Sequence, residues 1–466
     1  MPLFPLNLTV NGVPFTPLQF EDVLEITVDQ SAHLPDMFTI RMIDEQAAIA
    51  GMLFKWTDNT VAFPIGGKVN IVGTGAVFED PDNLPGALLP IGEITAVEPE
   101  FGEDGAATLV VRGYDLTHRL HRGKKTQTFM MMPDSLIWMS VCNLAGTPAT
   151  VTPTGGPREY VIQNNQTDWD FIKTRAKLYG YEMRKTELGT LMIGPREVPV
   201  DPTPALVTWG EDLFSFRPRV TASGQVSSVQ VLGYDFKTKL PITTPFAPLP
   251  PTDGGAQAKL DFAAAKLFDP TAAAVVTTNP PDLAPDALSN AKGVASDITS
   301  RFVQAEGLCK GNPSIRAGGI VIVKGVGSRF SGKYMVTSAR HVWKQDGEFV
   351  TEFSVTGSRP DTISDLIEDG MTNERMGRVQ GVVIGQVSNN LDPMGLGRVK
   401  VRFPWLGMLP PVESNWARVA TPWAGVLKSG AQFIPEINDE VLVAFEHGDP
   451  NRPYVIGSLF SPLQPP

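Results

Sequence analysis

Cysteine, charge and long apolar runs are all scarce in this chain of 466 residues. The two cysteines, Cys142 and Cys309, cannot form a disulfide framework, so we expect buried thiols in a reducing compartment. The longest apolar stretch predicted to be helical, residues 136–145, is too short to span a bilayer. The first five residues carry no basic cluster, which argues against a secretory signal. These absences predict a protein that is made in the cytoplasm and has no signal peptide.

Charged residues make up 19% of the chain, below the roughly 25% of an average soluble protein, and the net charge is −11. An acidic chain is a poor candidate for coating nucleic acid or an anionic membrane. Glycine and proline are abundant, with 44 and 41 residues. Sparse charge and many turn-forming residues together predict short strands joined by many turns, rather than long helices.

Residues 1–125 predict a small antiparallel β-barrel or sandwich. Apolar and polar residues alternate over 24–29 and 38–42, which is the period-two pattern of strands with one buried face. Asn11-Gly12 lies between two apolar runs and predicts a hairpin turn, because both residues tolerate positive φ angles. Further strands are predicted at 69–73, 91–98 and 107–113.

Residues 126–204 predict an α+β insert. Asp134 is suited to cap a helix that ends near residue 145. Thr167 opens a second helix in a pattern similar to a capping box, with Asp170 in the usual glutamate position. The prolines at the end of this segment predict a linker to the next domain.

Residues 205–357 predict a second β-rich domain that carries a long insertion. The proline- and alanine-rich stretch 236–285 has no apolar period, so we expect it to be irregular and to lie against another chain or a tube lumen. An apolar face at helical spacing predicts a helix over 286–306. Strands are predicted at 206–220, 226–234, 319–325, 333–343 and 349–356.

Residues 358–376 are polar and predict a linker, and residues 377–466 predict a small closed barrel of the OB type. Its five strand candidates are 378–387, 396–403, 415–421, 439–446 and 453–460. Alternation with polar neighbours predicts inward-facing side chains for Val399, Val401, Val441, Val443 and Phe445, with Lys400 on the outward face. The predicted fold class is mainly β with an α+β insert: two β-barrels plus a C-terminal OB-type β-barrel.

Two motifs point weakly to small ligands. Gly327 to Lys333 has the spacing of a phosphate-binding loop, but Tyr334 follows where Ser or Thr is needed, and a strand follows in place of a helix. A hairpin turn explains this segment better. His118 and His121 form the only histidine pair, and no cysteine or carboxylate cluster completes a zinc site beside them. Their basic neighbours predict a basic surface turn.

The sequence predicts no catalytic, cofactor-binding or metal-binding residue. It lacks the Gly-x-Ser-x-Gly elbow of many hydrolases, and with fifty carboxylates a Glu/Asp pair of glycosidase type arises by chance. The OB-type domain is a candidate for oligonucleotide binding, but its acidic and basic residues balance and give no basic footprint. We expect Trp405, Trp416 and Trp423 to pack the barrel or a subunit interface rather than to stack on bases.

Four consecutive motifs of the last domain carry a resemblance to a known family. They are GRVKVRFPW (397–405), NWARVATPWAG (415–425), PEINDEVLVAFEHGDP (435–450) and RPYVIGSLF (452–460). This domain resembles the OB-type barrel of the VgrG and phage baseplate protein V family. Three earlier segments are similar to the hub part of the same proteins: GYDLTHRLHR (113–122), QTDWDFI (166–172) with YGY (179–181), and GKYMVTSARH (332–341).

The resemblance implies a non-enzymatic structural protein, the hub and spike base of a contractile injection machine. It looks closest to the spike-hub proteins of extracellular contractile injection systems. It implies a homotrimer, because two similar hub barrels in each of three chains match a six-fold tube. The implied partners are the inner tube protein, baseplate proteins and a PAAR-like spike tip protein, with effector cargo as a further candidate. No nucleic acid is implied, and the target membrane is met only on firing.

The implied location is a phage tail-like particle, extracellular or cell-associated, whose chains are made in the bacterial cytoplasm. Alternatives within the family are the VgrG of a type VI secretion system and the hub of a contractile phage tail. An alternative of another class is a cell-wall hydrolase of the same device. Family members usually continue into a β-helical needle, whereas only residues 461–466 follow the last strand. We therefore expect the needle on another chain, or this sequence to be part of a longer one.

Overall fold

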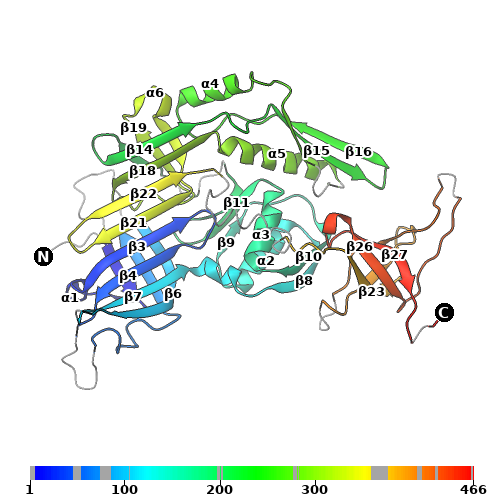
Figure 1. Ribbon diagram of the computed structural model, residues 1–466, viewed down its shortest axis with the longest axis horizontal. Coiled ribbons are helices and arrows are strands. Elements are labelled where there is room, and N and C mark those ends of the chain that lie inside the picture. The colour runs from blue at the N-terminus through cyan, green and yellow to red at the C-terminus, as the bar shows by residue number, and fades with distance from the viewer. Residues whose placement is uncertain are drawn as a thin grey trace.

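The computed structural model describes residues 6–45, 54–73, 86–103, 105–196, 203–276, 283–357, 376–406, 412–425 and 429–462, together with 200, 281, 465 and 466. The molecule is elongated, with the two β-rich units at one end, the insert in the middle and the terminal barrel at the other end (Figure 1). The predicted fold class, mainly β with an α+β insert and a C-terminal OB-type barrel, is confirmed. Among the described residues, no helix has the length and apolar character needed to cross a membrane.

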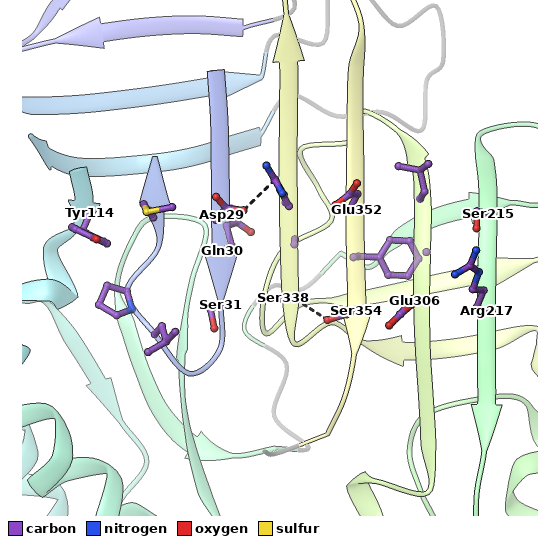
Figure 2. A pocket seen from close by; sticks show the side chains of 18 residues that line it. Asp29, Gln30, Ser31, Tyr114, Ser215, Arg217, Glu306, Ser338, Glu352 and Ser354 are labelled. Atoms are coloured by element: carbon purple, nitrogen blue, oxygen red, sulfur yellow. Dashed lines mark hydrogen bonds and ion pairs between the residues drawn. The ribbon is translucent and has the colours of Figure 1, made fainter. Parts of the chain in front are cut away.

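One 11-stranded sheet runs through both β-rich units. Its order is β14 (Leu213–Val220), β18 (Val303–Lys310), β22 (Phe349–Val355), β21 (Ser338–Lys344), β3 (Val23–Ser31), β4 (Met37–Ile43), β7 (Ala107–Asp115), β6 (Gly86–Phe101), β5 (Lys68–Gly73), β1 (Leu6–Val10) and β2 (Val13–Pro14). The units meet where β3 pairs antiparallel with β21. There Asp29 lies opposite Arg340, with 3.5 Å between Oδ1 and Nε (Figure 2). The two units are therefore continuous through main-chain hydrogen bonds.

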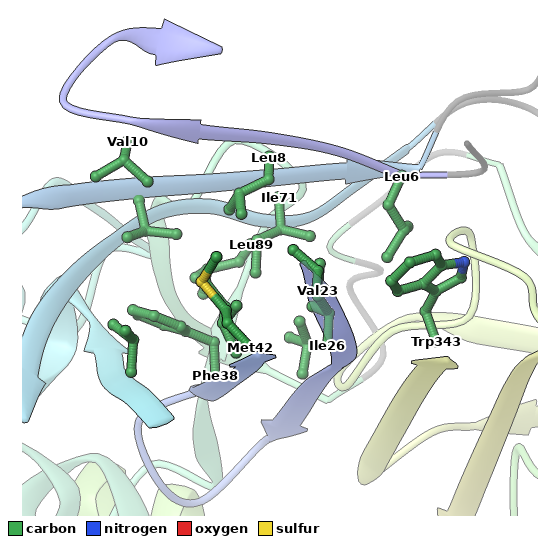
Figure 3. Packing of buried hydrophobic residues seen from close by; sticks show 14 of the residues in the cluster. Leu6, Leu8, Val10, Val23, Ile26, Phe38, Met42, Ile71, Leu89 and Trp343 are labelled. Atoms are coloured by element: carbon green, nitrogen blue, oxygen red, sulfur yellow. The ribbon is translucent and has the colours of Figure 1, made fainter. Parts of the chain in front are cut away.

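The first unit closes over an apolar core built from alternating strand residues (Figure 3). Ile26 and Phe38 are almost fully buried, as the period-two pattern predicts. Trp343 of β21 also lies in this core, so the second unit contributes to the packing of the first. The predicted Asn11-Gly12 turn is confirmed, because both residues have positive φ angles (50° and 80°) and β1 pairs with β2 around them. A short helix, α1 (Pro17–Phe20), leads into β3.

The second unit packs its part of the large sheet against a smaller one. The smaller sheet has the order β13 (Ala205–Thr208), β19 (Ile320–Lys324) and β20 (Gly332–Met335). A single helical turn, α6 (Gly327–Phe330), connects β19 to β20. Between the two sheets lies a second core that includes Leu213, Tyr334 and Phe353.

The prediction that 236–285 is irregular is wrong. The segment contributes β16 (Leu240–Phe246), α4 (Ala256–Ala265) and β17 (Ala273–Val276), and β16 and β17 both pair with β15 (Ser228–Asp235). The reason is tertiary packing. Small residues on α5 (Ala284–Ser300) let this helix lie close to Val229 and Val231, and the resulting core does not depend on an apolar period within the segment itself.

The helix predicted over 286–306 ends earlier than expected. Helix α5 stops at Ser300, and β18 starts at Val303. Gly307, the residue directly after the predicted helix, lies inside β18 opposite Phe353. A Cβ atom at Gly307 would come within 2.3 Å of the Phe353 ring, so the strand needs a glycine there.

The insert combines short strands with two helices. Its elements are a 3-10 helix η2 (Leu116–His121), β8 (Lys125–Met132), α2 (Asp134–Leu144), β9 (Ala149–Val151), β10 (Arg158–Gln166), α3 (Asp168–Lys177), β11 (Tyr181–Lys185) and β12 (Leu191–Pro195). The capping role of Thr167 is confirmed, since its Oγ1 accepts the Asp170 N–H at 3.1 Å. The capping role of Asp134 is wrong. Pro133 occupies the N-cap, and Asp134 turns into the interior to meet arginine side chains.

The terminal barrel is a five-stranded sheet in the order β24 (Lys400–Arg402), β23 (Val382–Asn389), β26 (Glu440–Phe445), β27 (Pro453–Leu459) and β25 (Arg418–Val419). The inward orientation predicted for Val399, Val401, Val441, Val443 and Phe445 is confirmed, because all five lie in one buried cluster. The linker predicted at 358–376 lies almost entirely outside the described residues.

Candidate functional site

The insert is bound to the first unit by a buried cluster of three charges. Lys185, at the end of β11, places its Nζ 2.5 Å from Asp36 Oδ1 and 2.9 Å from Asp115 Oδ2. The cluster carries one excess negative charge if all three groups are ionised. Burial raises the pKa of Asp36 to about 6, although Lys185 opposes this shift. This cluster fixes the turn before β4 and the start of η2 against the insert.

A second buried cluster binds the insert to the second unit. Arg196 follows β12, and its guanidinium lies 3.2 Å from Glu182 Oε1 and 3.1 Å from Asp253 Oδ2. Asp253 also accepts the main-chain N–H of Met335 at 2.7 Å. Arg196 is 5% exposed, so its charge is compensated by protein groups rather than by water.

A third cluster joins the insert to α5. Asp134 is fully buried between Arg175 Nε at 2.5 Å and Arg158 Nε at 3.3 Å. Burial alone would raise the pKa of the Asp134 carboxyl, but the two arginines outweigh it and hold the pKa below its usual value. Arg158 extends to Asp286 of α5, with 2.5 Å between Nη1 and Oδ2. Three separate ionic clusters thus attach the insert to its neighbours.

Strand β10 of the insert holds the terminal barrel. The Tyr160 hydroxyl donates to the Glu413 carbonyl at 2.7 Å, and the Ile162 N–H donates to Asn451 Oδ1 at 2.9 Å. Asn164 donates to the Gly377 carbonyl at 2.7 Å. Val412 of the barrel packs on Tyr160 and Ile162. The contact combines an apolar centre with directional hydrogen bonds, and this sets the orientation of the barrel on the insert.

A cleft of about 470 Å³ lies beside this contact, between the insert, the β15–β16 hairpin and the terminal barrel. Arg418 of the barrel lies over the Phe236 ring of the hairpin, 5.5 Å from its centroid. The barrel therefore contacts two parts of the chain that are distant in sequence.

The large sheet presents a groove of about 910 Å³, lined by apolar and charged residues, on the face opposite its cores (Figure 2). Asp29, Arg340 and Glu352 follow one another across β3, β21 and β22. Ser338 and Ser354 form the next row, with their hydroxyl oxygens 2.6 Å apart. Burial raises the pKa of Asp29, while Arg340 opposes the shift. Acidic, basic and hydroxyl side chains alternate across these strands, so the groove has no single dominant charge.

The structure answers the two ligand candidates from the sequence. The Gly327–Lys333 segment is the turn between β19 and β20, which pair antiparallel, so the hairpin-turn interpretation is confirmed. The predicted basic surface turn is present at Arg122, Lys124 and Lys125, which are exposed, but the two histidines before it are not part of that surface. His118 is buried with its Nε2 2.8 Å from Glu93 Oε2. Within the described part of the chain, no group of three potential metal ligands occurs.

His121 is also drawn inward. Its ring stacks on Trp169 with 4.7 Å between centroids, and burial lowers its pKa to about 4. Cys142 and Cys309 are fully buried, as predicted, and burial raises the pKa of each thiol.

The three tryptophans of the terminal barrel differ from one another. Trp416 is partly buried under Arg398 and Lys400, whose charged groups lie 5.7 and 5.6 Å from its ring. Trp405 and Trp423 are 51% and 61% exposed, so the prediction that they pack the interior of the barrel is wrong for these two residues. A role for these two in a subunit interface stays a prediction.

The junction residues were not found by sequence reasoning. Lys185 is the last residue of β11, and Arg196 follows directly after β12. A charged residue at the end of such a strand is usually solvated, and only the folded chain brings Asp36 and Asp253 to these positions.

Two family models match consecutive parts of the chain. The model of the Alg8 N-terminal domain matches residues 91–345, more than half of the chain. The model of the type VI secretion system/phage-baseplate injector OB domain matches residues 383–460. The type VI secretion system spike protein VgrG5 of Pseudomonas aeruginosa is 40% identical over 87 residues, which cover 18% of this chain and 11% of that protein. The spike protein VgrG3 of Vibrio cholerae is 36% identical over 86 residues, which cover 18% of this chain and 8% of that protein.

The chain belongs to the VgrG and phage baseplate hub family. The segments matched in these curated VgrG proteins span about a tenth of their length, whereas one solved structure matches the whole chain. That structure is an Escherichia coli component of the type VI secretion system, described as similar to the T4 tail proteins gp27 and gp5. It covers 97% of this chain and 99% of its own, with a TM-score of 0.56 and 13% identity.

A second hub-like structure, the 43 kDa tail protein of prophage MuSo2 from Shewanella oneidensis, covers 75% of this chain and 97% of its own. Its TM-score is 0.52, and its identity is 14%. At such low identities the likeness concerns the fold. The VgrG and baseplate hub fold therefore extends over the two β-rich units, which we now call the first and second hub units, as well as over the barrel.

Proposed function

We propose that this chain is the structural hub and spike base of a contractile injection system. In this role three copies form an adaptor between the six-fold inner tube and baseplate and the membrane-puncturing tip. The observation that carries the proposal is the continuous chain of rigid contacts from the hub sheet to the terminal barrel. The three ionic clusters hold the insert to both hub units, and β10 holds the barrel.

These contacts suit a part that transmits thrust. Breaking a buried ionic contact leaves an uncompensated charge, so the insert resists displacement from the hub units. The action is mechanical rather than enzymatic, in keeping with the matched relatives, which are named spike proteins. Family likeness favours an inner tube protein, baseplate proteins and a PAAR-like tip protein as partners, and effector cargo as a further one. Target membrane is met only on firing, and nucleic acid is not a partner.

The proposed location is a phage tail-like particle whose chains are made in the bacterial cytoplasm. Among the branches of the family, we place the chain with extracellular contractile injection systems.

Loosening the barrel on β10 tests the proposal. Tyr160→Phe combined with Asn451→Ala removes two of the hydrogen bonds between the insert and the barrel. We expect particles of normal length that contract but deliver into target cells at least tenfold less often. In small-angle scattering, the purified variant should show a larger radius of gyration. Tyr454→Phe is the matched control, since its hydroxyl contacts Glu446 and Arg418, which both belong to the barrel. Normal delivery by the double variant, despite a larger radius of gyration, would contradict the proposal.

A further inference from the structure

The cleft beside the barrel contact has walls from three parts of the chain that are distant in sequence. The insert supplies the start of β10 and the end of α3, and the terminal barrel supplies β25 and β27. The second hub unit supplies the tip of the β15–β16 hairpin and the start of α5. The volume of about 470 Å³ lies within the range of ligand pockets, roughly 300–1,000 Å³. The proposed hub role uses the contacts around this cleft but leaves the cleft itself without a task.

Asn290 of α5 is a buried polar side chain that lines the cleft. It is 8% exposed, and no residue that the structure describes forms a hydrogen bond with its side chain. One helical turn earlier, Asp286 is bound by Arg158 instead, with 2.9 Å between Oδ1 and Nη2. Burying an amide without a hydrogen bond costs free energy, and asparagine is a poor choice for a helix interior. Asn290 therefore offers both a donor and an acceptor to a ligand in the cleft.

Arg418 of β25 lines the same cleft and is exposed. It lies beside Tyr454 in the register of β25 and β27, and its guanidinium is 5.5 Å from the Phe236 ring centroid and 5.8 Å from that of Tyr454. A hydrogen bond to the Tyr454 hydroxyl also holds it. A guanidinium carries five N–H donors, so most of them stay available for a planar acceptor such as a carboxylate.

The other basic side chains of the cleft already have acidic partners. Four arginines pair with carboxylates: Arg158 with Asp286, Arg175 with Asp134, Arg398 with Asp392 and Arg452 with Glu446. Lys237 interacts with Asp235 of its own hairpin turn. Among the described residues, Arg418 forms no ion pair, so the cleft has one cation prepared for an added negative charge.

Aromatic rings cover much of the remaining wall. Tyr234 and Phe236 come from the hairpin, whereas Trp416 and Tyr454 come from the barrel. Tyr234 is 50% exposed, although it lies beside a cleft that could cover it. Aromatic faces bury apolar side chains over a large area and still leave a polar edge in contact with water. The cleft thus combines apolar walls with one free cation and one free amide.

We infer that the cleft binds a short extended segment of another polypeptide that carries a carboxylate side chain next to an apolar one. Arg418 binds the carboxylate, the Asn290 amide bonds to a peptide group through its donor and its acceptor, and the rings cover the apolar side chain. A nucleic-acid strand fits less well, because its phosphates need several free cations. The bound segment contacts the insert, the hairpin and the barrel together, and so holds the barrel against the second hub unit.

A display library of random heptapeptides, selected on the purified full chain, tests the inference. The enriched peptides should carry Asp or Glu beside an aromatic or aliphatic residue. Fluorescence polarisation with the most enriched peptide then compares variants whose melting temperatures match that of the native chain. Arg418→Gln and Asn290→Leu should each weaken binding at least tenfold. Arg418→Lys keeps the charge but loses the planar fork, so its affinity should lie between those of the native chain and Arg418→Gln.

The matched controls are Arg122→Gln and Asn143→Leu, which change exposed residues outside the cleft and should leave the affinity unchanged. Three results would overturn the inference: a library without enriched acidic peptides, equal affinity of the native chain and Arg418→Gln, or equally tight binding of a short oligothymidylate through Arg418. None of these results bears on the hub role, because the delivery test with the β10 variant uses no ligand in the cleft.

Discussion

Lys185 stands between Asp36 and Asp115 with almost no access to water. A buried cluster with one excess negative charge favours uptake of a proton, and Asp36 takes it because burial raises its pKa to about 6. Asp115 behaves differently, since Lys185 and hydrogen bonds from Thr117 and Asp36 outweigh burial and lower its pKa. The two carboxyls that contact Lys185 therefore have pKa values shifted in opposite directions.

Asp36→Asn tests this assignment through pH. The folded pKa of Asp36 lies above its unfolded value of 3.8, so the stability that its proton contributes is present at low pH and is lost as pH rises through about 6. Asparagine keeps the Oδ1 acceptor for Lys185 and Ser31 without the charge. The melting temperature of the variant should therefore exceed that of the native chain at pH 8, and the difference should shrink towards pH 5.

The matched control for Asp36→Asn is Asp346→Asn, in the exposed turn between β21 and β22, which should give no such trend. Scanning calorimetry at several pH values measures both variants. A difference between Asp36→Asn and the native chain that is the same at pH 5 and pH 8 would show that Asp36 does not titrate there. His33 and His121, whose burial lowers their pKa to about 4, change stability in the opposite direction but cancel in this comparison.

Val401 tests the interior of the terminal barrel. Its side chain is fully buried, so Val401→Asp places a carboxyl among apolar groups and should cost several kcal/mol of barrel stability. The control is Val382→Asp on β23, where the side chain is 53% exposed and the expected change is within about 0.5 kcal/mol. Denaturant unfolding followed by tryptophan fluorescence measures both. Equal effects of the two substitutions would contradict the inward assignment.

Lys400 makes more contacts than the outward orientation predicted for its side chain indicates. It does lie on the face opposite Val401, but its Nζ is 2.8 Å from Glu413 Oε2 and 5.6 Å from the Trp416 ring. Alternation predicts only which side a residue faces. Whether another chain segment covers that side depends on the whole fold, so the salt bridge could not be read from the strand pattern.

At the scale of elements, the sequence predicted those features that depend only on residues close together in the chain. The Asn11-Gly12 turn and the Thr167 cap follow from backbone and side-chain preferences within four residues, and both are confirmed. The same approach gave a wrong prediction for residues 236–285. The strands of this stretch are stabilised by pairing with β15 and by α5, which lie outside the stretch, so its own sequence carries no sufficient period.

The end of α5 shows the same limit. Apolar residues at helical spacing continue past Ser300, yet the chain turns into β18, because Val303 and Ala305 fill the core of the second unit as strand residues. Helical and strand patterns overlap over a few residues, and only pairing with β14 and β22 decides between them. The ionic clusters, which join residues up to 149 positions apart, are equally beyond local signals.

Arg196 tests how the insert is attached to the second unit. Arg196→Met leaves Glu182 and Asp253 buried without their cation, and we expect a loss of about 3–5 kcal/mol at this contact. Protease should then separate the insert from the second unit at temperatures where the native chain stays intact. The control, Arg329→Met, removes an Arg–Asp pair whose arginine is 57% exposed, and should cost less than about 1 kcal/mol. Equal protease sensitivity of the two variants would contradict a structural role for the Arg196 cluster.

At the scale of the whole molecule, the two hub units of each chain would let the proposed three-fold assembly match a six-fold tube. Each chain supplies two similar strand sets side by side, joined through β3 and β21. Three such chains offer six similar positions around one axis. The terminal barrel occurs once per chain and lies at the far end of the molecule, so the assembly would change from six-fold to three-fold symmetry along its length (Figure 1).

The mass of the purified chain in solution tests this view of the molecule most directly. Light scattering at micromolar concentration should give three times the 50.4 kDa chain mass, about 151 kDa, with no lower species at dilution to the detection limit. We expect the interfaces of the proposed trimer to be large and of the obligate kind, so the trimer should persist on dilution. A constant mass of 50.4 kDa at every concentration would contradict the trimeric hub.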